Sequence, residues 1–394
     1  DHSTPSNEDL SSTLKKPSYQ RQPTNQDLYN RHLDSVVADV SGSGVDSVGK
    51  ETLPRMSFLG LWVVGLSLWQ PGRSRLAARV YRWSILLMVV LAAGTLCANV
   101  VFDSLYPERY HEVHREIVNS SWTTIPLCLS ALIGVFTALG KGDNAWERMM
   151  TALSSHTRDS DVQDRWHALA RWDALVLLGL LAACVATELG RGFFLQCAWD
   201  QALTFTEVVI CIVHISMIHS MMSACRAVVV LVDNYGTFML ATPTFKQATL
   251  HWKLLQALLR KCTSGMEWMF FGEIAGLLLM LPAVVLDWLV FSERWHRETA
   301  VSALPAAITL VGATLLCRTA ASISEKCSRV PSLVNALPFG PGTERVQQHI
   351  VEYIVQSNAG FYVAGIKLTS ELLLKFSYTW TFLVFGVWSA VFRT

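Results

Sequence analysis

Charged residues are scarce in this sequence of 394 residues. Asp, Glu, Lys and Arg together make up 16% of it, whereas a soluble domain typically carries about 25%. The 32 basic and 31 acidic residues nearly cancel, and a nucleic-acid-binding protein would need a basic face. Residues 1–54 are polar, and long uncharged apolar runs follow them. This pattern excludes a soluble enzyme, a coiled coil, a disordered chain and a secreted disulfide scaffold, and we expect no nucleic-acid partner.

Motifs for catalysis and for metal binding are missing as well. The sequence contains no HExxH, GxSxG, P-loop or GxGxxG motif, so we expect neither an enzymatic activity nor a cofactor. Its nine cysteines include no CxxC pair and no spacing typical of a metal site. They are therefore predicted to be small core residues, and no metal site is expected.

The sequence instead has apolar runs long enough to cross a bilayer, which takes about 20 mostly apolar residues. Five runs contain no charged residue, and two more are interrupted by Glu188 and Asp287. Together they predict an all-α, polytopic membrane protein with seven transmembrane helices. The spans are expected at about 84–102, 117–140, 172–190, 203–225, 270–291, 300–317 and 375–392.

The basic residues predict the orientation, because Lys and Arg close to spans stay on the cytoplasmic side. Nineteen of them lie beside one set of segments and six beside the other. This asymmetry predicts a cytoplasmic N-terminus and an extracellular C-terminus. Asn119, in the sole N-x-[ST] sequon, then lies at the outer edge of the second span and is a candidate glycosylation site.

Outside the spans, two regions are expected in the cytoplasm. Residues 1–55 lack the apolar core of a signal peptide and form a disordered tail, while residues 56–394 form the membrane domain. Residues 319–374 are expected to form a helical anchor segment, because apolar side chains recur there at helical spacing. The same spacing occurs before the fifth span. Glu273, at the inner start of that span, is a candidate ion-pair partner of an arginine such as Arg226. The apolar positions of these two stretches are Leu250, Leu254, Leu255, Leu258 and Leu259, then Val346, Ile350, Val351, Ile354 and Val355.

The topology and one C-terminal stretch carry a family resemblance. The stretch runs from Phe361 to Val387, with Ala364-Gly365 and Leu368 in a turn followed by Thr379-Trp380 and, five residues on, Gly386-Val387. It resembles the signature of arthropod gustatory receptors, in which an Ala-Gly-hydrophobic turn leads to Thr-Tyr, five residues and Gln-Phe. Trp replaces Tyr, Gly replaces Gln and Val replaces Phe here. The chain is therefore similar to a divergent member of the arthropod gustatory and odorant chemoreceptors.

This resemblance implies a gustatory-type, ligand-gated, nonselective cation channel in the plasma membrane. It implies a homo- or heterotetramer with related subunits, opened by an extracellular small-molecule tastant, with the last span lining a central pore. By the alignment to the signature, Leu383 lies at the hydrophobic constriction, and Thr379, Gly386 and Val387 complete the pore and gate positions.

The resemblance also implies a ligand pocket in the outer half of the second to sixth spans. Carboxylates with aromatic neighbours there could hold a polyol or an amine. For Glu188 and Asp287, a simple position at the end of a span, near water, is the alternative. His214 and His219 lie deeper and are five positions apart, so they do not share a helix face well and are not expected to bind a metal as a pair. Each is predicted to be a hydrogen-bonded interior histidine. The candidate pocket residues are Trp122, Thr124, Thr187, Glu188, Phe205, Glu207, Asp287 and Trp288.

Two other functions stay open at this stage. A metabotropic seven-span receptor is disfavoured by the inverted topology and by the absence of DRY and NPxxY motifs. A membrane transporter often has internal repeats and broken helices, and no clear repeat relates the two halves of this chain.

Overall fold

The structure is a computed structural model of the chain. It describes residues 84, 86–98, 101, 125–134, 149, 152–153, 156, 160–194, 198–241, 244–290, 297–337 and 344–391, all within one compact unit, Val48–Thr394. The expected tail 1–55, the sequon at Asn119 and the pocket candidates Trp122 and Thr124 lie outside these residues.

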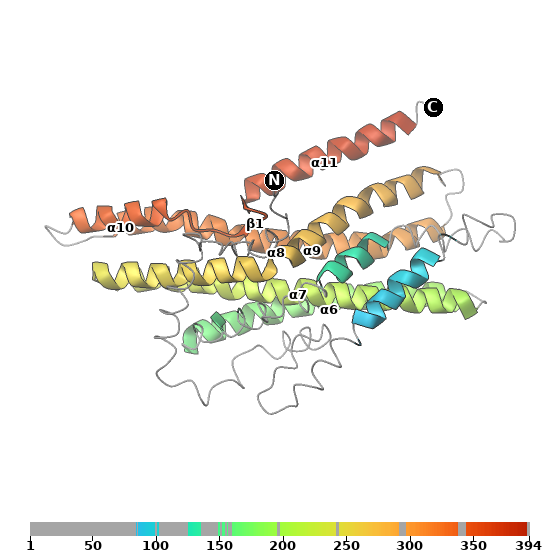
Figure 1. Cartoon of the computed structure of the whole chain (residues 1–394), viewed down its shortest axis with the longest axis horizontal. Coiled ribbons are helices and arrows are strands. Elements are labelled where there is room, and N and C mark those ends of the chain that lie inside the picture. Colours follow the sequence, from blue (N-terminus) through green and yellow to red (C-terminus); the bar gives the residue numbers. More distant parts are fainter. Residues whose placement is uncertain are drawn as a thin grey trace, which may run out of the picture. The chain divides into compact units, whose positions relative to one another are not determined.

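Long helices dominate the described part of the chain (Figure 1). They are α6 (Ser160–Phe194), α7 (Ala198–Leu240), α8 (Phe245–Val290) and α9 (Arg297–Ala336). α6 packs chiefly on α7, and α7 also packs on α9. α6 and α7 are antiparallel: the Trp166 indole N–H, far from the short connection between the two helices, donates to the Ser223 carbonyl, which lies about as far from that connection along α7.

The burial of these helices shows which of them face lipid. In the most apolar part of α7, 94% of the residues are buried inside the protein, whereas in the corresponding part of α6 only 17% are buried. Such an exposed apolar helix would be unfavourable in water, because apolar surface is stabilised only where water is excluded. α7 is therefore the central helix, α6 presents its apolar side to lipid, and the chain is a helical membrane protein.

Three described stretches are long and apolar enough to cross a membrane: Asp161–Thr187, Thr204–Leu240 and Ala307–Ala336. Two shorter apolar helices, Leu86–Ala98 and Ile125–Gly134, precede them. These stretches overlap five of the expected spans. The count of seven and the orientation stay predictions.

The helices run further than the expected spans. α7 continues to Leu240, and α8 begins at Phe245, well before the fifth expected span at 270. A capping box starts α8, because Thr244 N–H donates to Gln247 Oε1 and the Gln247 N–H donates back to Thr244 Oγ1. The segment between the fourth and fifth expected spans therefore consists of two long helical extensions separated by four residues.

The C-terminal part contains α10 (Glu344–Gln356), a small hairpin and α11 (Ser370–Val391). The hairpin pairs β1 (Tyr362–Val363) with β2 (Ile366–Lys367) in antiparallel register. Its two turn residues, Ala364 and Gly365, have φ of +50° and +77°, as a two-residue turn of this hand requires. Within the described ranges, the prediction of an all-α chain is confirmed apart from this hairpin.

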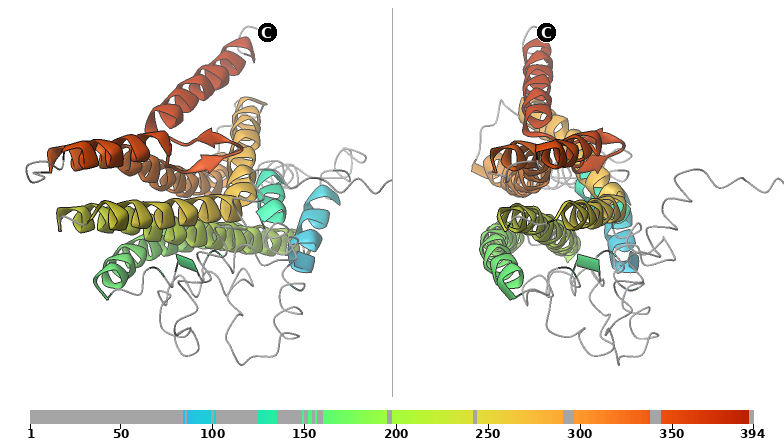
Figure 2. Two further views of the ribbon diagram at one scale, coloured as in Figure 1. Left: turned by 60° about the vertical axis from the view of Figure 1, so that its left-hand side comes forward. Right: turned by 90° about the vertical axis from the view of Figure 1, so that its left-hand side faces the viewer.

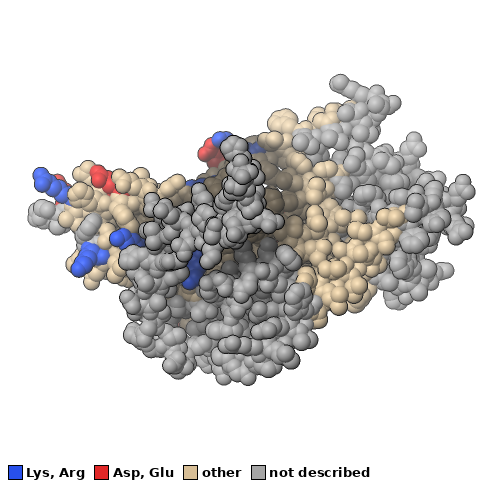
Figure 3. Space-filling model, viewed as in Figure 1, with Lys and Arg blue, Asp and Glu red and all other residues tan. Residues whose placement is uncertain are grey.

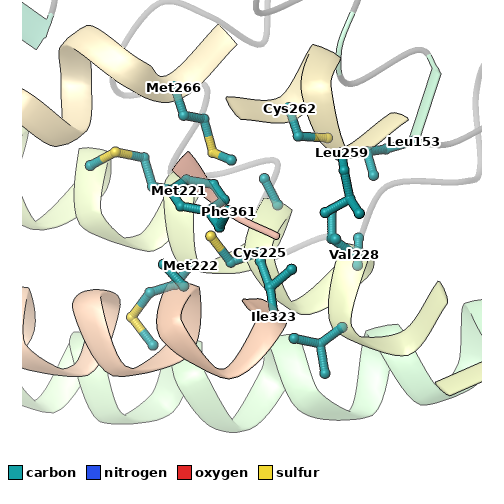
Figure 4. Close-up of a cluster of buried hydrophobic side chains, with 14 of the residues drawn as sticks. Leu153, Met221, Met222, Cys225, Val228, Leu259, Cys262, Met266, Ile323 and Phe361 are labelled. Atoms are coloured by element: carbon teal, nitrogen blue, oxygen red, sulfur yellow. The ribbon is translucent and has the colours of Figure 1, made fainter. Parts of the chain in front are cut away.

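Side chains from α7, α8 and α9 meet Leu153 and Phe361 in one apolar cluster (Figure 4). Phe361 reaches it from the residues just before β1 and is fully buried. The cysteine prediction is confirmed for the six buried thiols among the described residues, whereas Cys97 is exposed and Cys317 is half-buried. The labelled members are Leu153, Met221, Met222, Cys225, Val228, Leu259, Cys262, Met266, Ile323 and Phe361.

The apolar faces predicted for the cytoplasmic stretches are buried within the same chain. Leu258 and Leu259 of α8 and Ile350 and Ile354 of α10 lie in the core. At the edges of the predicted faces, Leu250 and Val355 are exposed.

Candidate functional site

α11 contacts the rest of the described chain far less than the other long helices do. Figures 1 and 2 show it leaving the bundle at an angle, and its contacts are with α8 and α9 near its start. Large apolar side chains along it are nonetheless exposed, up to 75% for Phe382. Such a helix needs lipid or another protein chain to cover it. The exposed members are Leu372, Leu374, Phe376, Tyr378, Phe382 and Phe385.

All four predicted pore residues lie on α11. The Thr379 hydroxyl is exposed and donates to the Lys375 carbonyl, 2.9 Å away. Gly386 is exposed, and a Cβ built there would meet nothing within 4 Å. The side chains of Leu383 and Val387 lie outside the described set, so these two residues are placed only by their positions along the helix.

The hairpin attaches α11 to the bundle through hydrogen bonds from its backbone. The Phe361 N–H donates to Ser324 Oγ of α9, at 3.0 Å, and the Ala364 N–H donates to Glu267 Oε1 of α8, at 3.1 Å. The ring of Phe361 packs on Phe270 of α8, with centroids 5.2 Å apart. Both α8 and α9 therefore hold the segment that leads into α11.

The turn before the hairpin is held equally closely. Trp252 Nε1 of α8 donates to Ser357 Oγ at 3.0 Å, and Lys367 Nζ donates to Asn358 Oδ1 at 3.1 Å. A Cβ at Gly360 would lie 2.5 Å from Lys367 Cε and 3.0 Å from Ser324 Oγ. A side chain at this position would therefore displace the end of the Lys367 side chain and press on Ser324 Oγ.

Titratable groups near the hairpin differ in their surroundings. Lys375 Nζ lies 2.6 Å from Glu371 Oε1, and this amine lowers the pKa of the Glu371 carboxyl. Burial raises the pKa of the Tyr362 hydroxyl, and it raises the pKa of the Cys262 thiol to about 12. The Cys262 thiol therefore stays protonated and unreactive at neutral pH.

The expected pocket residues do not all point to one place. Glu207 of α7 is buried, whereas Phe205, two positions earlier, is 67% exposed. On α6, the Thr187 hydroxyl is half-buried and donates to the Ala183 carbonyl at 2.8 Å. Glu188, Asp287 and Trp288 lie on α6 and α8, with side chains outside the described set.

The expected pairing of Glu273 with Arg226 is wrong. Arg226 instead makes a bidentate pair with Asp173 of α6, at 2.8 and 3.1 Å. Glu273 is fully buried beside His214, with 3.1 Å between Oε2 and Nε2. Both histidines predicted to be interior, His214 and His219, are buried.

Charge on the described surface is unevenly distributed. On the face drawn in Figure 3, charged side chains gather over the half that carries α10 and the start of α11, and the described surface of the other half lacks them. Lys326 of α9 and Asp233 of α7 form an ion pair where these two helices continue beyond their expected spans. The extended helical ends thus carry the polar surface that suits an aqueous compartment.

Three positioning residues, Glu267, Ser324 and Ser130, were not singled out from the sequence. A single polar residue on a long helix gives no periodic signal. The partners of these three residues also lie about 37 to 143 residues away along the chain, so local sequence does not reveal them. The Gly272-xxx-Gly276 spacing beside Ser130 is a recognisable sign of close helix packing and could have indicated it.

Comparison with known proteins gives a match by structure alone. No protein-family model matches the sequence, and no curated protein matches it. The insect olfactory receptor OR5 from Machilis hrabei is similar, with a TM-score of 0.55 and 10% identity over 84% of this chain and 96% of that receptor. The same receptor in complex with eugenol gives a TM-score of 0.59 and 10% identity, over 92% of this chain and 99% of the other. The chain therefore has the fold of an insect olfactory receptor, which confirms at the level of the fold the resemblance to arthropod chemoreceptors.

Proposed function

We propose that the chain is a subunit of a ligand-gated, nonselective cation channel of the arthropod chemoreceptor type, located in the plasma membrane. The observation that carries the proposal is the exposure of α11, whose large apolar side chains find no cover in the described part of the chain. The likeness of the fold to insect olfactory receptor OR5 supports it.

In this proposal, four subunits related by closed symmetry bring their α11 helices together around a pore. Thr379, Leu383, Gly386 and Val387 share one side of the helix, since their spacing follows its period. A ring of four Leu383 side chains closes the pore by excluding water from a narrow apolar passage. The exposed aromatic side chains on other sides, such as Phe382, contact neighbouring subunits or lipid.

The ligand is a small molecule that arrives from outside, and a tastant is the class that the gustatory-type signature favours. The bound eugenol in OR5 is such a small molecule. Glu207, buried on the central helix α7, is the strongest of the pocket candidates, with Thr187 on the adjacent helix α6. A ligand opens the channel by binding the open form more tightly, by about 5.5 kcal/mol for a near-complete switch.

Patch-clamp recording from cells that express this chain alone tests the function. We expect a current carried by both Na⁺ and K⁺ when a panel of tastants and odorants is applied. A second arm places an epitope tag at the C-terminus, which should be accessible to antibody in intact cells. Surface-expressed chain with an intracellular C-terminus would contradict the channel topology, and such a chain without any evoked current would remove the homomeric channel.

A further inference from the structure

A buried polar cluster lies where the helix Ile125–Gly134 meets α7 and α8. His214 Nε2 and Glu273 Oε2 are 3.1 Å apart, with side-chain exposures of 1% and 2%. Ser130 is buried beside them. The separation is that of an ion pair, yet the His214 ring and the Glu273 carboxyl are not aligned for a hydrogen bond, and the Ser130 hydroxyl is the described polar group near enough to interact with that carboxyl.

Close helix packing leaves little space around this cluster. A Cβ on Gly276 would lie 2.8 Å from Ser130 Cβ and 3.2 Å from the Pro126 carbonyl oxygen. A Cβ on Gly134 would lie 1.7 Å from Met217 Cε. An organic ligand therefore does not fit between these helices as they are packed, and a proton does.

The charge state of the pair follows from its surroundings. A net charge in an apolar interior is costly, because the protein cannot replace its hydration. A buried ion pair is stabilised only when its hydrogen bonds are well aligned, which is not the case here. The pair is therefore neutral in the packed form, with a neutral imidazole on His214 and a protonated carboxyl on Glu273.

Other titratable groups around the pair do not supply a compensating charge. The Cys317 thiol of α9 is near enough to Glu273 to interact with it, and Ser130 contributes a hydroxyl. On α7, His219 is five positions from His214, and Glu207 is seven positions away on the other side, about 10 Å along the helix. Arg226 lies about 18 Å along the helix and is paired with Asp173. On α8, Glu267 is six positions from Glu273 and accepts the hydrogen bond from the hairpin.

We propose that His214 and Glu273 form a proton-binding site whose proton holds the helix Ile125–Gly134 against α7 and α8. Loss of this proton leaves a buried carboxylate, and the packing loosens to admit water. The site responds to alkaline conditions, and it does so whether or not the chain conducts ions.

The sign of the pH effect follows from the protons bound. The packed pair holds one proton, whereas a solvated pair loses its last proton around the ordinary imidazole pKa of about 6.5. From about pH 6.5 upward the packed form binds more protons than the loosened form, so its stability falls as the pH rises. This loss ends when the packed pair itself gives up its proton.

Thermal unfolding of the purified full chain in detergent, at pH 6.5 and pH 9, tests the site with Glu273→Gln. The amide is a neutral stand-in for the protonated carboxyl, so the variant keeps the packing at both values. We expect the wild type to lose roughly 3–6 °C more than this variant between the two pH values. His219→Gln, another buried histidine of α7, should behave like the wild type. Equal losses in wild type and Glu273→Gln would overturn the proposal.

Infrared difference spectroscopy of the wild type provides a second test that needs no stable variant. Raising the pH from 6.5 to 9 should remove the band of a protonated, buried carboxyl, and isotope-labelled glutamate identifies it as glutamate. The absence of such a band at pH 6.5 would overturn the proposal even if Glu273→Gln failed to fold.

Discussion

Glu267 on α8 accepts a hydrogen bond from the backbone N–H of Ala364, 3.1 Å away, at the tip of the hairpin that leads into α11. Together with Ser324 on α9, which accepts the N–H of Phe361, it ties the hairpin to both helices. A movement of α8 or α9 therefore reaches α11 through a short, well-anchored segment.

Replacing Glu267 by Ala tests this attachment. The substitution removes the acceptor, and we expect a loss of about 0.5–1.5 kcal/mol in stability together with a smaller ligand-evoked current at equal surface expression. Glu267→Gln keeps an acceptor oxygen at the same place and should stay close to the wild type in both measurements. If the two variants behaved alike, the hydrogen bond would have no part in transmission.

The turn of the hairpin offers a test of backbone strain alone. Gly365 has a φ of +77°, and a Cβ there would meet nothing within 4 Å, so Gly365→Ala changes only the backbone preference. We expect this variant to lose about 1–2 kcal/mol. Ala364, at φ +50°, already carries such a penalty, so Ala364→Asn should be neutral or stabilising, because Asn tolerates this region. Melting temperatures that change in the same direction for both would contradict the observed turn.

The pair between Asp173 and Arg226 joins α6 to α7 at the ends of the expected spans 172–190 and 203–225. Its bidentate geometry and partial burial predict that Asp173→Ala and Arg226→Ala each cost about 1.5–3 kcal/mol. Exchanging the two residues, as Asp173→Arg with Arg226→Asp, should recover part of this loss. The measurement is a double-mutant cycle on the melting temperature, and strictly additive effects would show that the pair contributes nothing.

Periodic apolar patterns made the helices and the buried faces predictable, because burial repeats with the helical period. They predicted the apolar parts of α6, α7 and α9, and the burial of Leu258, Leu259, Ile350 and Ile354. They did not predict that the helices continue beyond the expected spans, since the extensions of α8 and α9 pack on that of α7, as Trp252 beside Tyr235 and Lys326 beside Asp233 show, rather than on lipid. The ends of those helices depend on tertiary contacts and local capping.

The ion-pair partners could not be predicted from the sequence. Arg226 has several carboxylates at comparable sequence distance, and the choice of Asp173 over Glu273 depends on the antiparallel register of α6 and α7. That register is a property of packed side chains such as Trp166, whose indole meets the Ser223 carbonyl. The Ala364-Gly365 turn, by contrast, was predictable, because glycine readily adopts positive φ and the resemblance marked the position.

The proposed gate makes a direct prediction for Leu383. Replacing it by Ala or Ser removes the apolar ring that closes the pore, so the basal conductance should rise in the absence of ligand. Thr381→Ala is the control, since that side chain is exposed two positions earlier, on roughly the opposite side of α11. Unchanged basal current and unchanged ion permeability in both Leu383 variants would remove this residue from the pore.

Gly386 stands where the gustatory signature has Gln, and its surroundings leave room for that side chain. In a tetramer, Gly386→Gln places four amide groups in one ring beside the proposed gate, which narrows the passage and offers polar contacts to ions. We expect a lower single-channel conductance and altered relative permeability for Na⁺ and K⁺. Gly386→Ala is the matched control, because it shares the gain in helix propensity, about 1 kcal/mol, without adding the amide. If both variants conduct like the wild type, Gly386 faces away from the pore. A change of the same size in both would assign the effect to the stiffness of α11 instead of the amide ring.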